Sequence, residues 1–333
     1  MTDRLTPLSS QRGWDRSDPE GAIAAAAQRC SNWGRWGPDD VHGTLNFLAA
    51  PGRRDAARLV RKGASFSLSL AFGADGPQRG WRRRTNPVHT MLDTGTDAEA
   101  GTQGFPHGLG GADDFIAMPL QCSTQWDGLG HIFDHGRAWN GRLAGQVVTS
   151  QGDQTTGIQT AAHQLVGRGI LADVGRNHGK DDELPDGFAI TEDHIASTLQ
   201  CQGLSPTVRR GDMVLIRTGQ LTRAKRDGWN HYAGGPAPGL SFSTADWLYR
   251  SEIAAIATDT WGFEVRPNEF DDAFQPLHQV AIPHIGLFIG EMWDLDALAH
   301  DCAQDGVYEF FLNAAPLPVT GAVGAPVNPI AVK

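Results

Sequence analysis

Short apolar runs alternate with helix-like segments over the second half of the chain, and this alternation constrains the fold more than any other feature. Residues 169–175, 211–218 and 253–258 are apolar runs bounded by polar or glycine residues, which is typical of buried strands. Thr191 and Gly203 are suitable start and stop residues for a helix between the first two runs. The order predicts a layered α/β domain rather than a simple parallel nucleotide-binding sheet. The same alternation continues to the C-terminus, with predicted helices at 243–250, 276–283 and 294–303 and predicted strands at 285–290 and 307–313.

The first half of the chain is richer in loops. The 41 glycines and 19 prolines among 333 residues indicate many ordered turns. A helix is expected at 51–62 and strands at 65–73 and 114–122, with long loops over 74–114. Loops of that length are usually functional or wrap around a neighbouring subunit. Residues 1–30 are polar at first and predict an N-terminal arm.

Charge and composition exclude several classes of protein. The formal net charge of −10 argues against a nucleic-acid partner. No run of about 18 apolar residues is present, so a membrane-spanning helix is not expected. The first twenty residues have no apolar core typical of a signal peptide, and the four cysteines form no CxxC pair, so a cytoplasmic protein is expected. The nucleotide-binding, serine-hydrolase and HExxH metalloprotease motifs are absent.

One polar cluster lies at residues 121–135. Gln125 and Asp127 are two residues apart, so they share one face if the segment is a strand. Together with Gln121 and His131 they offer amide and carboxylate oxygens and an imidazole, which suit Mn²⁺ or Zn²⁺. The alternative is that Asp127 caps a helix and the histidines are polar core residues.

A second cluster contains His278, His284 and Glu291 in an otherwise apolar segment. A glutamate in a buried strand needs a metal or an arginine as partner, whereas in a surface turn it needs none. Because metal sites usually draw ligands from separate elements, the two clusters are candidates for one site.

The two clusters resemble the signature of the cyclase-like metal-dependent hydrolases, a family that includes bacterial kynurenine formamidase and isatin hydrolase. The usual motif of that family reads His-x-Gly-Thr-His-x-Asp-x-Pro-x-His. The likeness covers about residues 115–333, and the segment NWGRWGPDDVHGTLN at 32–46 resembles a longer branch of the family. The matching positions are Thr124, Asp127 and His131 in the first segment, and His278 and Glu291 in the second.

This sequence departs from the family motif at four positions. Gln121 and Gln125 stand where the motif has histidines, Ser123 replaces the glycine and Leu129 the proline. Glutamine offers a neutral carbonyl oxygen in place of an imidazole nitrogen. The resemblance therefore implies one divalent metal, with Mn²⁺ favoured over Zn²⁺. The expected ligands are Asp127, His278 and Glu291, with Gln125 or Gln121 as a further ligand.

The resemblance also implies a fold, a reaction and an assembly. The fold is the swivelling β/β/α kind, a mixed sheet curled into a small barrel with flanking helices, and residues 31–333 form one catalytic domain. The reaction is hydrolysis of a small-molecule cyclic or aromatic amide, formamide, lactam or lactone, with His131 or Glu291 as the catalytic acid–base. The assembly is a homodimer or homotetramer. Two alternatives remain, a metal-dependent ring-opening lyase or isomerase and a metal-free binding protein.

Three further residues are candidates for substrate binding. Trp126 lies inside the first cluster and suits an aromatic or cyclic substrate, or else it belongs to the core. His89 and His107 lie in the long loops and either enter the pocket or face solvent.

Overall fold

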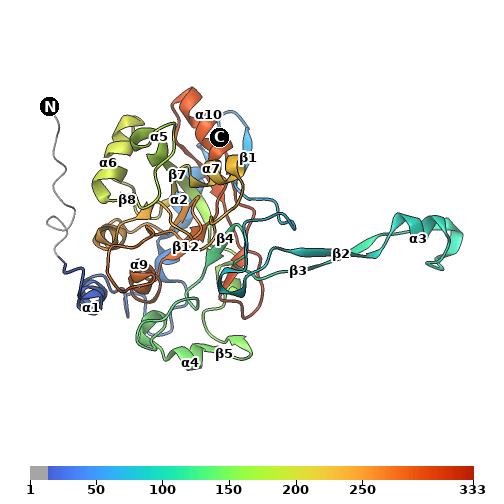
Figure 1. Cartoon of the computed structure of the whole chain (residues 1–333), viewed down its shortest axis with the longest axis horizontal. Helices are drawn as coiled ribbons and strands as arrows, with labels where there is room; N and C mark the ends of the chain where they lie inside the picture. The colour runs from blue at the N-terminus through green and yellow to red at the C-terminus, as the bar shows by residue number, and fades with distance from the viewer. Residues whose placement is uncertain (1–13) are drawn as a thin grey trace.

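A nine-stranded mixed sheet, curled into a half-barrel and covered by helices, organises the computed structural model, which describes residues 14–333 (Figure 1). The strand order is β1-β15-β13-β7-β9-β11-β12-β4-β14, and the central β7, β9, β11 and β12 run parallel. This architecture confirms the predicted α/β class and cyclase-like fold. The strands of the sheet are β1 (Ser65–Ser67), β4 (Gln125–Asp127), β7 (Val166–Asp173), β9 (Met213–Arg217), β11 (Ala255–Thr258), β12 (Phe288–Glu291), β13 (Glu309–Asn313), β14 (Gly324–Pro326) and β15 (Ile330–Val332).

The two faces of the sheet build two separate cores. Side chains alternate along a strand, so Leu215 and Phe288 face one core while Val214 and Ile289 face the other. Most of the helices cover the second face, whereas loops, 3₁₀ turns and the helix at Asp296–Asp305 pack against the first. The helices are α1 (Pro19–Arg29), α2 (Ala50–Ala57), α3 (Gly95–Glu99), α4 (Ala144–Val147), α5 (Val174–His178), α6 (Glu192–Cys201), α7 (Gln220–Asp227), α8 (Ala245–Arg250), α9 (Pro276–Val280) and α10 (Asp296–Asp305).

Two predicted elements are shorter in the structure than expected. The helix expected at 51–62 is α2, which ends at Ala57 because only Ala56 of its residues is buried and no apolar face stabilises a further turn. The strand expected at 65–73 pairs with β15 only as far as Ser67. Beyond it the N–H of Leu70 donates to the side chain of Thr124 instead of to a neighbouring strand.

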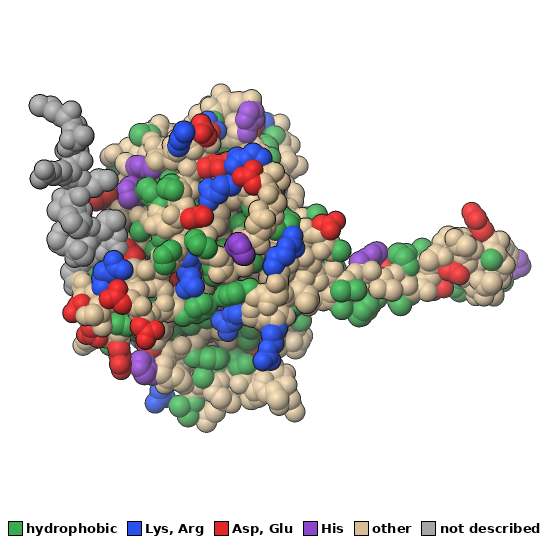
Figure 2. All heavy atoms as spheres, in the orientation of Figure 1, with side chains coloured by type: hydrophobic (Ala, Val, Ile, Leu, Met, Phe, Trp, Pro, Cys, Tyr) green, Lys and Arg blue, Asp and Glu red, His purple; other side chains and the backbone are tan. Residues whose placement is uncertain are grey.

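The long loops of the first half form a protruding hairpin. β2 (Val88–Asp93) pairs with β3 (Asp113–Ala117), and the segment between them carries α3 at the far end from the body (Figure 1). The hairpin exposes large apolar side chains, visible as green spheres in Figure 2. They are Val88, Met91, Leu92, Phe105, Leu109, Phe115 and Ile116.

The predicted N-terminal arm of residues 1–30 lies partly outside the described residues. Within them, α1 buries Ile23 and Ala26 in the same core as α8 and α9. This part of the arm therefore belongs to the body. None of the helices between residues 14 and 333 is long and apolar enough to cross a membrane. Two short pairings of two-residue strands complete the fold, formed by β5 (Val148–Thr149) with β6 (Gly152–Asp153) and by β8 (Ala189–Ile190) with β10 (Gly239–Leu240).

Candidate metal centre

The antiparallel pair β4–β12 places the polar residues of both sequence clusters on one face of the sheet. In its register Gln125 lies opposite Glu291, and Asp127 lies opposite Ile289. Because side chains alternate along a strand, Gln125, Asp127 and Glu291 point to the face opposite Trp126, which most of the helices cover. The tertiary structure thus joins two segments that lie more than 160 residues apart in the chain.

His278 reaches this group from α9. The ligand atoms of Asp127, His278 and Glu291 all lie within 4.8 Å of one another, and the three side chains are buried. His278 Nε2 lies 3.3 Å from Glu291 Oε1. Residues 14–333 contain one such group of potential ligands. Its members are the three residues for which the family resemblance predicted ligand positions.

Glu264 orients His278 from behind and was not identified from the sequence. Its Oε1 atom lies 2.6 Å from His278 Nδ1, and its carboxylate also accepts the backbone N–H groups of Leu277 and His278. A bridge to Leu240 of β10 holds the backbone of Glu264. A carboxylate behind an imidazole fixes its tautomer and leaves the other nitrogen free for a metal. The local signal was weak, since Glu264 lies in a loop without a recognisable motif.

The electrostatics of the group fit a divalent cation. Burial and the neighbouring charge of Asp127 raise the pKa of Glu291 to about 7. Burial opposes the charged form of His278, but its hydrogen bonds to Glu264 and Glu291 outweigh burial and raise its pKa to about 10. Two buried carboxylates side by side are unfavourable without a positive charge between them, and a divalent ion supplies that charge.

The two glutamines occupy different places. Gln125 Nε2 donates to Glu291 Oε2 at 2.9 Å, and its buried Oε1 has no hydrogen-bond partner. Since the two ends of an amide are interchangeable by rotation, Gln125 has an oxygen to offer a cation in the group. Gln121 packs against Gly324 of β14, and its buried Nε2 forms no hydrogen bond within the described residues. The structure therefore brings Gln125, but not Gln121, into contact with Asp127 and Glu291.

His131 lies at the edge of the group. Its Nε2 is 3.6 Å from Asp127 Oδ1, and 18% of its side chain is exposed, so it connects the buried carboxylates to solvent. Burial lowers the pKa of His131 against the opposing effect of Asp127, which favours the neutral imidazole.

The structure does not support the three predicted substrate contacts within one chain. Trp126 is fully buried on the opposite face of β4, where it packs against Trp293 and donates to the carbonyl of Ala314. It points away because it lies one residue from Gln125 and Asp127 in a strand. His89 lies on β2 and is bonded to Asp114, and His107 lies exposed in the segment beyond β2, so the hairpin carries both away from the site (Figure 1).

His284 of the second cluster takes part in a different network. Its Nε2 lies 2.8 Å from Asp134 Oδ2, and its ring stacks on Trp33. Asp134 also contacts His135 and Gln279. The two histidines nearest in sequence to His278 and His131 are thus held by a shared aspartate rather than by the candidate metal centre.

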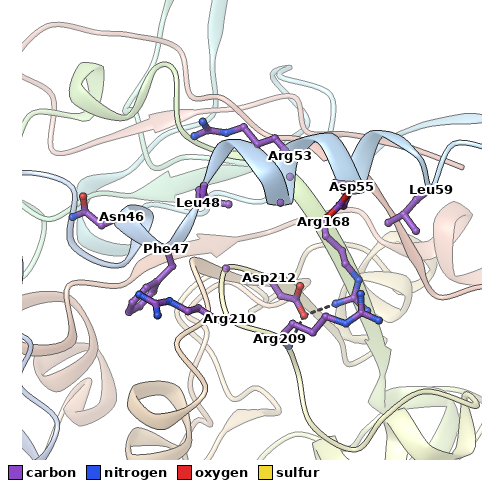
Figure 3. A pocket seen from close by; sticks show the side chains of 15 residues that line it. Asn46, Phe47, Leu48, Arg53, Asp55, Leu59, Arg168, Arg209, Arg210 and Asp212 are labelled. Atoms are coloured by element: carbon purple, nitrogen blue, oxygen red, sulfur yellow. Dashed lines mark hydrogen bonds and ion pairs between the residues drawn. The ribbon is translucent and has the colours of Figure 1, made fainter.

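A cavity of about 400 Å³ lies elsewhere, at the amino ends of β7 and β9 (Figure 3). Arg168 there is neutralised by Asp212 and Glu309. Since Glu291 is the last residue of the parallel strand β12, the candidate metal centre lies at the opposite end of the parallel strands.

The fold and the buried Asp–His–Glu group define a protein of the α/β half-barrel class with a single candidate metal centre. Residues 65–265 match the family model described as "Putative cyclase". A solved structure described as a novel cyclase is 38% identical, covers 92% of this chain and 99% of its own, and superimposes with a TM-score of 0.83. The chain therefore belongs to the cyclase family.

More distant structures share the fold. Isatin hydrolase A from Labrenzia aggregata is 18% identical with a TM-score of 0.57, and the match covers 83% of this chain and 94% of that one. A predicted metal-dependent hydrolase from Bacillus stearothermophilus is 17% identical with a TM-score of 0.51, covering 80% and 97%. No curated protein matches the chain significantly.

Proposed function

We propose that this protein is a metal-dependent hydrolase that cleaves the C–N bond of a cyclic or aromatic amide, formamide or lactam, or the ester bond of a lactone. The observation that carries the proposal is the buried group of Asp127, His278 and Glu291 with the partly exposed His131 at its edge. The names of the structural neighbours, an isatin hydrolase and a predicted metal-dependent hydrolase, support the same class of reaction.

Each residue has a distinct task in this proposal. Asp127, His278 and Glu291 would hold the ion, Gln125 would add a neutral oxygen, and Glu264 keeps His278 in place. A divalent ion supplies Lewis acidity, which polarises a carbonyl group and makes water more acidic. His131, kept neutral by burial, accepts a proton at its ring nitrogen and returns it to the leaving group.

The proton-transfer role falls to His131 rather than to Glu291. Both oxygens of Glu291 already have partners, one at His278 and one at Gln125, and the side chain is buried. A general base must reach both solvent and substrate, and of the two residues His131 has exposed surface. We therefore assign Glu291 to the metal.

We propose one ion per chain, with Mn²⁺ favoured over Zn²⁺. The ligand set is two carboxylates, one imidazole and one amide oxygen, and such oxygen-rich sets suit harder ions than the histidine-rich sets of zinc enzymes. Elemental analysis of the purified protein checks both the number and the identity of the ion. Two zinc ions per chain would contradict the proposal.

The variant His131→Gln tests the mechanism. We expect metal content to stay unchanged and kcat to fall about 10²–10⁴-fold, the usual scale for losing acid–base assistance. His135→Gln, which changes an exposed histidine bonded to Asp134, is the matched control and should retain activity. Loss of the metal in His131→Gln, with turnover restored by excess Mn²⁺, would make His131 a ligand instead.

Hydrolysis in ¹⁸O-labelled water should place the label in the product, and its absence would indicate a lyase or isomerase.

We further propose that the protein assembles with copies of itself through the hairpin of residues 88–117. An isolated two-stranded hairpin is marginally stable in water, yet this one exposes Phe115 and Ile116 away from the body. It carries five acidic residues and no lysine or arginine, so it suits a surface of a second copy that contains arginines. Sedimentation should show a dimer or tetramer that Phe115→Ser with Ile116→Ser dissociates. A monomeric unmodified protein at micromolar concentration would contradict this assembly.

A further inference from the structure

An aromatic cluster adjoins the candidate metal centre. Trp81 packs edge-on against Trp261 at 4.7 Å between ring centroids and stacks with Phe274 at 6.0 Å. Trp261 belongs to the same apolar cluster as Met292, the residue directly after Glu291. Phe274 is 44% exposed, so the cluster extends from the metal centre to the surface.

Two arginines lie over these rings. The guanidinium carbons of Arg82 and Arg84 are 5.8 and 5.6 Å from the centroid of Trp81, and Arg82 also lies over Phe274. The backbone at Arg82 and Arg83 is left-handed, with φ of 48° and 63°. Such angles are uncommon for residues other than glycine. They persist where the surrounding structure holds the backbone in a strained conformation, often at functional sites.

These arginines have no acidic partner. Among the residues that the structure describes, Arg82, Arg83 and Arg84 form neither an ion pair nor a side-chain hydrogen bond, although the chain as a whole is acidic. Arg84 is half-buried, and a half-buried guanidinium without an anion is unfavourable. Figure 2 shows Lys and Arg side chains on the face from which the hairpin leaves the body.

The metal centre does not account for these positive charges. With Glu264 behind His278, three carboxylates surround a divalent ion and leave one negative charge, fewer than the three guanidinium groups of Arg82, Arg83 and Arg84. The guanidinium groups of Arg82 and Arg84 are therefore free to bind an anion that lies beside the metal. A guanidinium binds a carboxylate with two parallel hydrogen bonds, and the neighbouring rings suit a planar group.

We propose that the substrate carries a carboxylate in addition to the bond that is cleaved, and that Arg84, assisted by Arg82, binds this carboxylate while Trp81 and Phe274 contact the planar part of the molecule. The proposed reaction is the context for this inference, but the binding of the anion does not depend on hydrolysis. The substrate class is thus an aromatic acid bearing an amide, formamide, lactam or lactone.

Binding of benzoate and of benzamide, followed by tryptophan fluorescence and by calorimetry, tests the inference without any reaction. We expect the unmodified protein to bind benzoate about tenfold or more tightly than benzamide, the scale of one charge-assisted hydrogen bond, and we expect added salt to reduce the difference. Arg84→Gln should abolish this preference, and Arg84→Lys should retain part of it. Arg83→Gln, which removes the same charge from a residue that contacts no ring, should retain all of it. Benzoate that binds directly to the metal ion would do so in all these variants, so it does not contribute to the difference between them.

The outcomes separate this inference from the proposed hydrolysis. Equal affinity for benzoate and benzamide, or equal losses in Arg83→Gln and Arg84→Gln, would overturn the inference. If Arg84→Gln changes the mass of the assembly in sedimentation but leaves the affinity for benzoate unchanged, the inference is also wrong. The arginine would then bind the acidic hairpin of a second copy. Turnover of 3-formamidobenzoate and formanilide by the metal-loaded protein is a separate measurement. If neither compound reacts while benzoate binding depends on Arg84, the anion site stands and the proposed reaction is wrong for formamides.

Discussion

Glu264 Oε1 lies 2.6 Å from Nδ1 of His278, and the same carboxylate accepts the backbone N–H of His278. This double contact fixes both the side chain and the backbone of one residue of the candidate metal centre. Glu264 thereby directs the other ring nitrogen of His278 toward Glu291.

We expect Glu264→Gln to weaken metal binding by about 10–100-fold, the usual effect of losing a carboxylate behind a ligating histidine. Competition with a chromogenic chelator measures the affinity. Glu269→Gln is the matched control, because Glu269 is also a buried carboxylate that accepts a backbone N–H, from Phe242, without touching His278. Equal affinities in the two variants would remove Glu264 from the metal centre.

Asp127→Asn should abolish metal binding without destabilising the metal-free protein. The substitution keeps the shape of the side chain and removes a charge that opposes ionisation of Glu291. In thermal unfolding, Mn²⁺ should stabilise the unmodified protein by about 2.7 kcal/mol at a hundredfold excess over its dissociation constant, and should leave Asp127→Asn unchanged. Stabilisation of both proteins by the same amount would place the ion elsewhere.

Gln125→His and Gln121→His should differ in their effect on zinc. Gln125 contacts Glu291, so an imidazole there adds a nitrogen ligand, whereas Gln121 packs against Gly324. We expect Gln125→His to raise Zn²⁺ affinity at least about tenfold. Substituting a residue that only hydrogen-bonds to a metal ligand already changes metal affinity by that factor. Calorimetric titration of both variants checks this difference. A gain in Gln121→His alone would show that the loop before β4 rearranges around the ion.

Lys333 provides a test of stability away from the site. Its ammonium group is buried and binds Asp301 and Asp305 at 2.8 and 2.9 Å, while the more exposed Lys62 binds the same two carboxylates. We expect Lys333→Met to lower the free energy of unfolding by about 1–3 kcal/mol, and Lys62→Met by less than about 1 kcal/mol.

The pH dependence of that difference follows from the two carboxylates. A hydrogen bond from Lys333 lowers the pKa of Asp301, and the two lysines outweigh burial to lower the pKa of Asp305. A carboxylate whose pKa is lowered in the folded state stabilises the protein at pH values above the ordinary aspartate pKa of 3.8. This contribution is lost as the pH falls from 3.8 through the lowered pKa. Urea unfolding at pH 7 and near pH 3 should therefore show the effect of Lys333→Met shrinking in acid. If Lys333→Met destabilises the protein equally at both pH values, the effect comes from packing of the lysine stem rather than from its charge.

Local patterns in the sequence predicted the central elements and the candidate metal ligands. Apolar runs predicted the central strands β7, β9 and β11, and Thr191 at the start of α6 caps it as expected. Such signals depend on neighbouring residues alone, because alternation and capping act within a few positions of the chain. The candidate ligands were found in the same way, from Asp127, His278 and Glu291 as polar residues in apolar surroundings that resemble a family motif.

The tertiary structure decided which of the candidates meet. The antiparallel register of β4 and β12 turns Gln125 toward Glu291 and Trp126 into the opposite core, and a shift of one residue would exchange them. The hairpin removes His89 from the site, and the loop after β11 brings Glu264 to it. Contacts of this kind depend on strand pairing and loop paths between distant segments, and no local pattern of residues encodes them by itself.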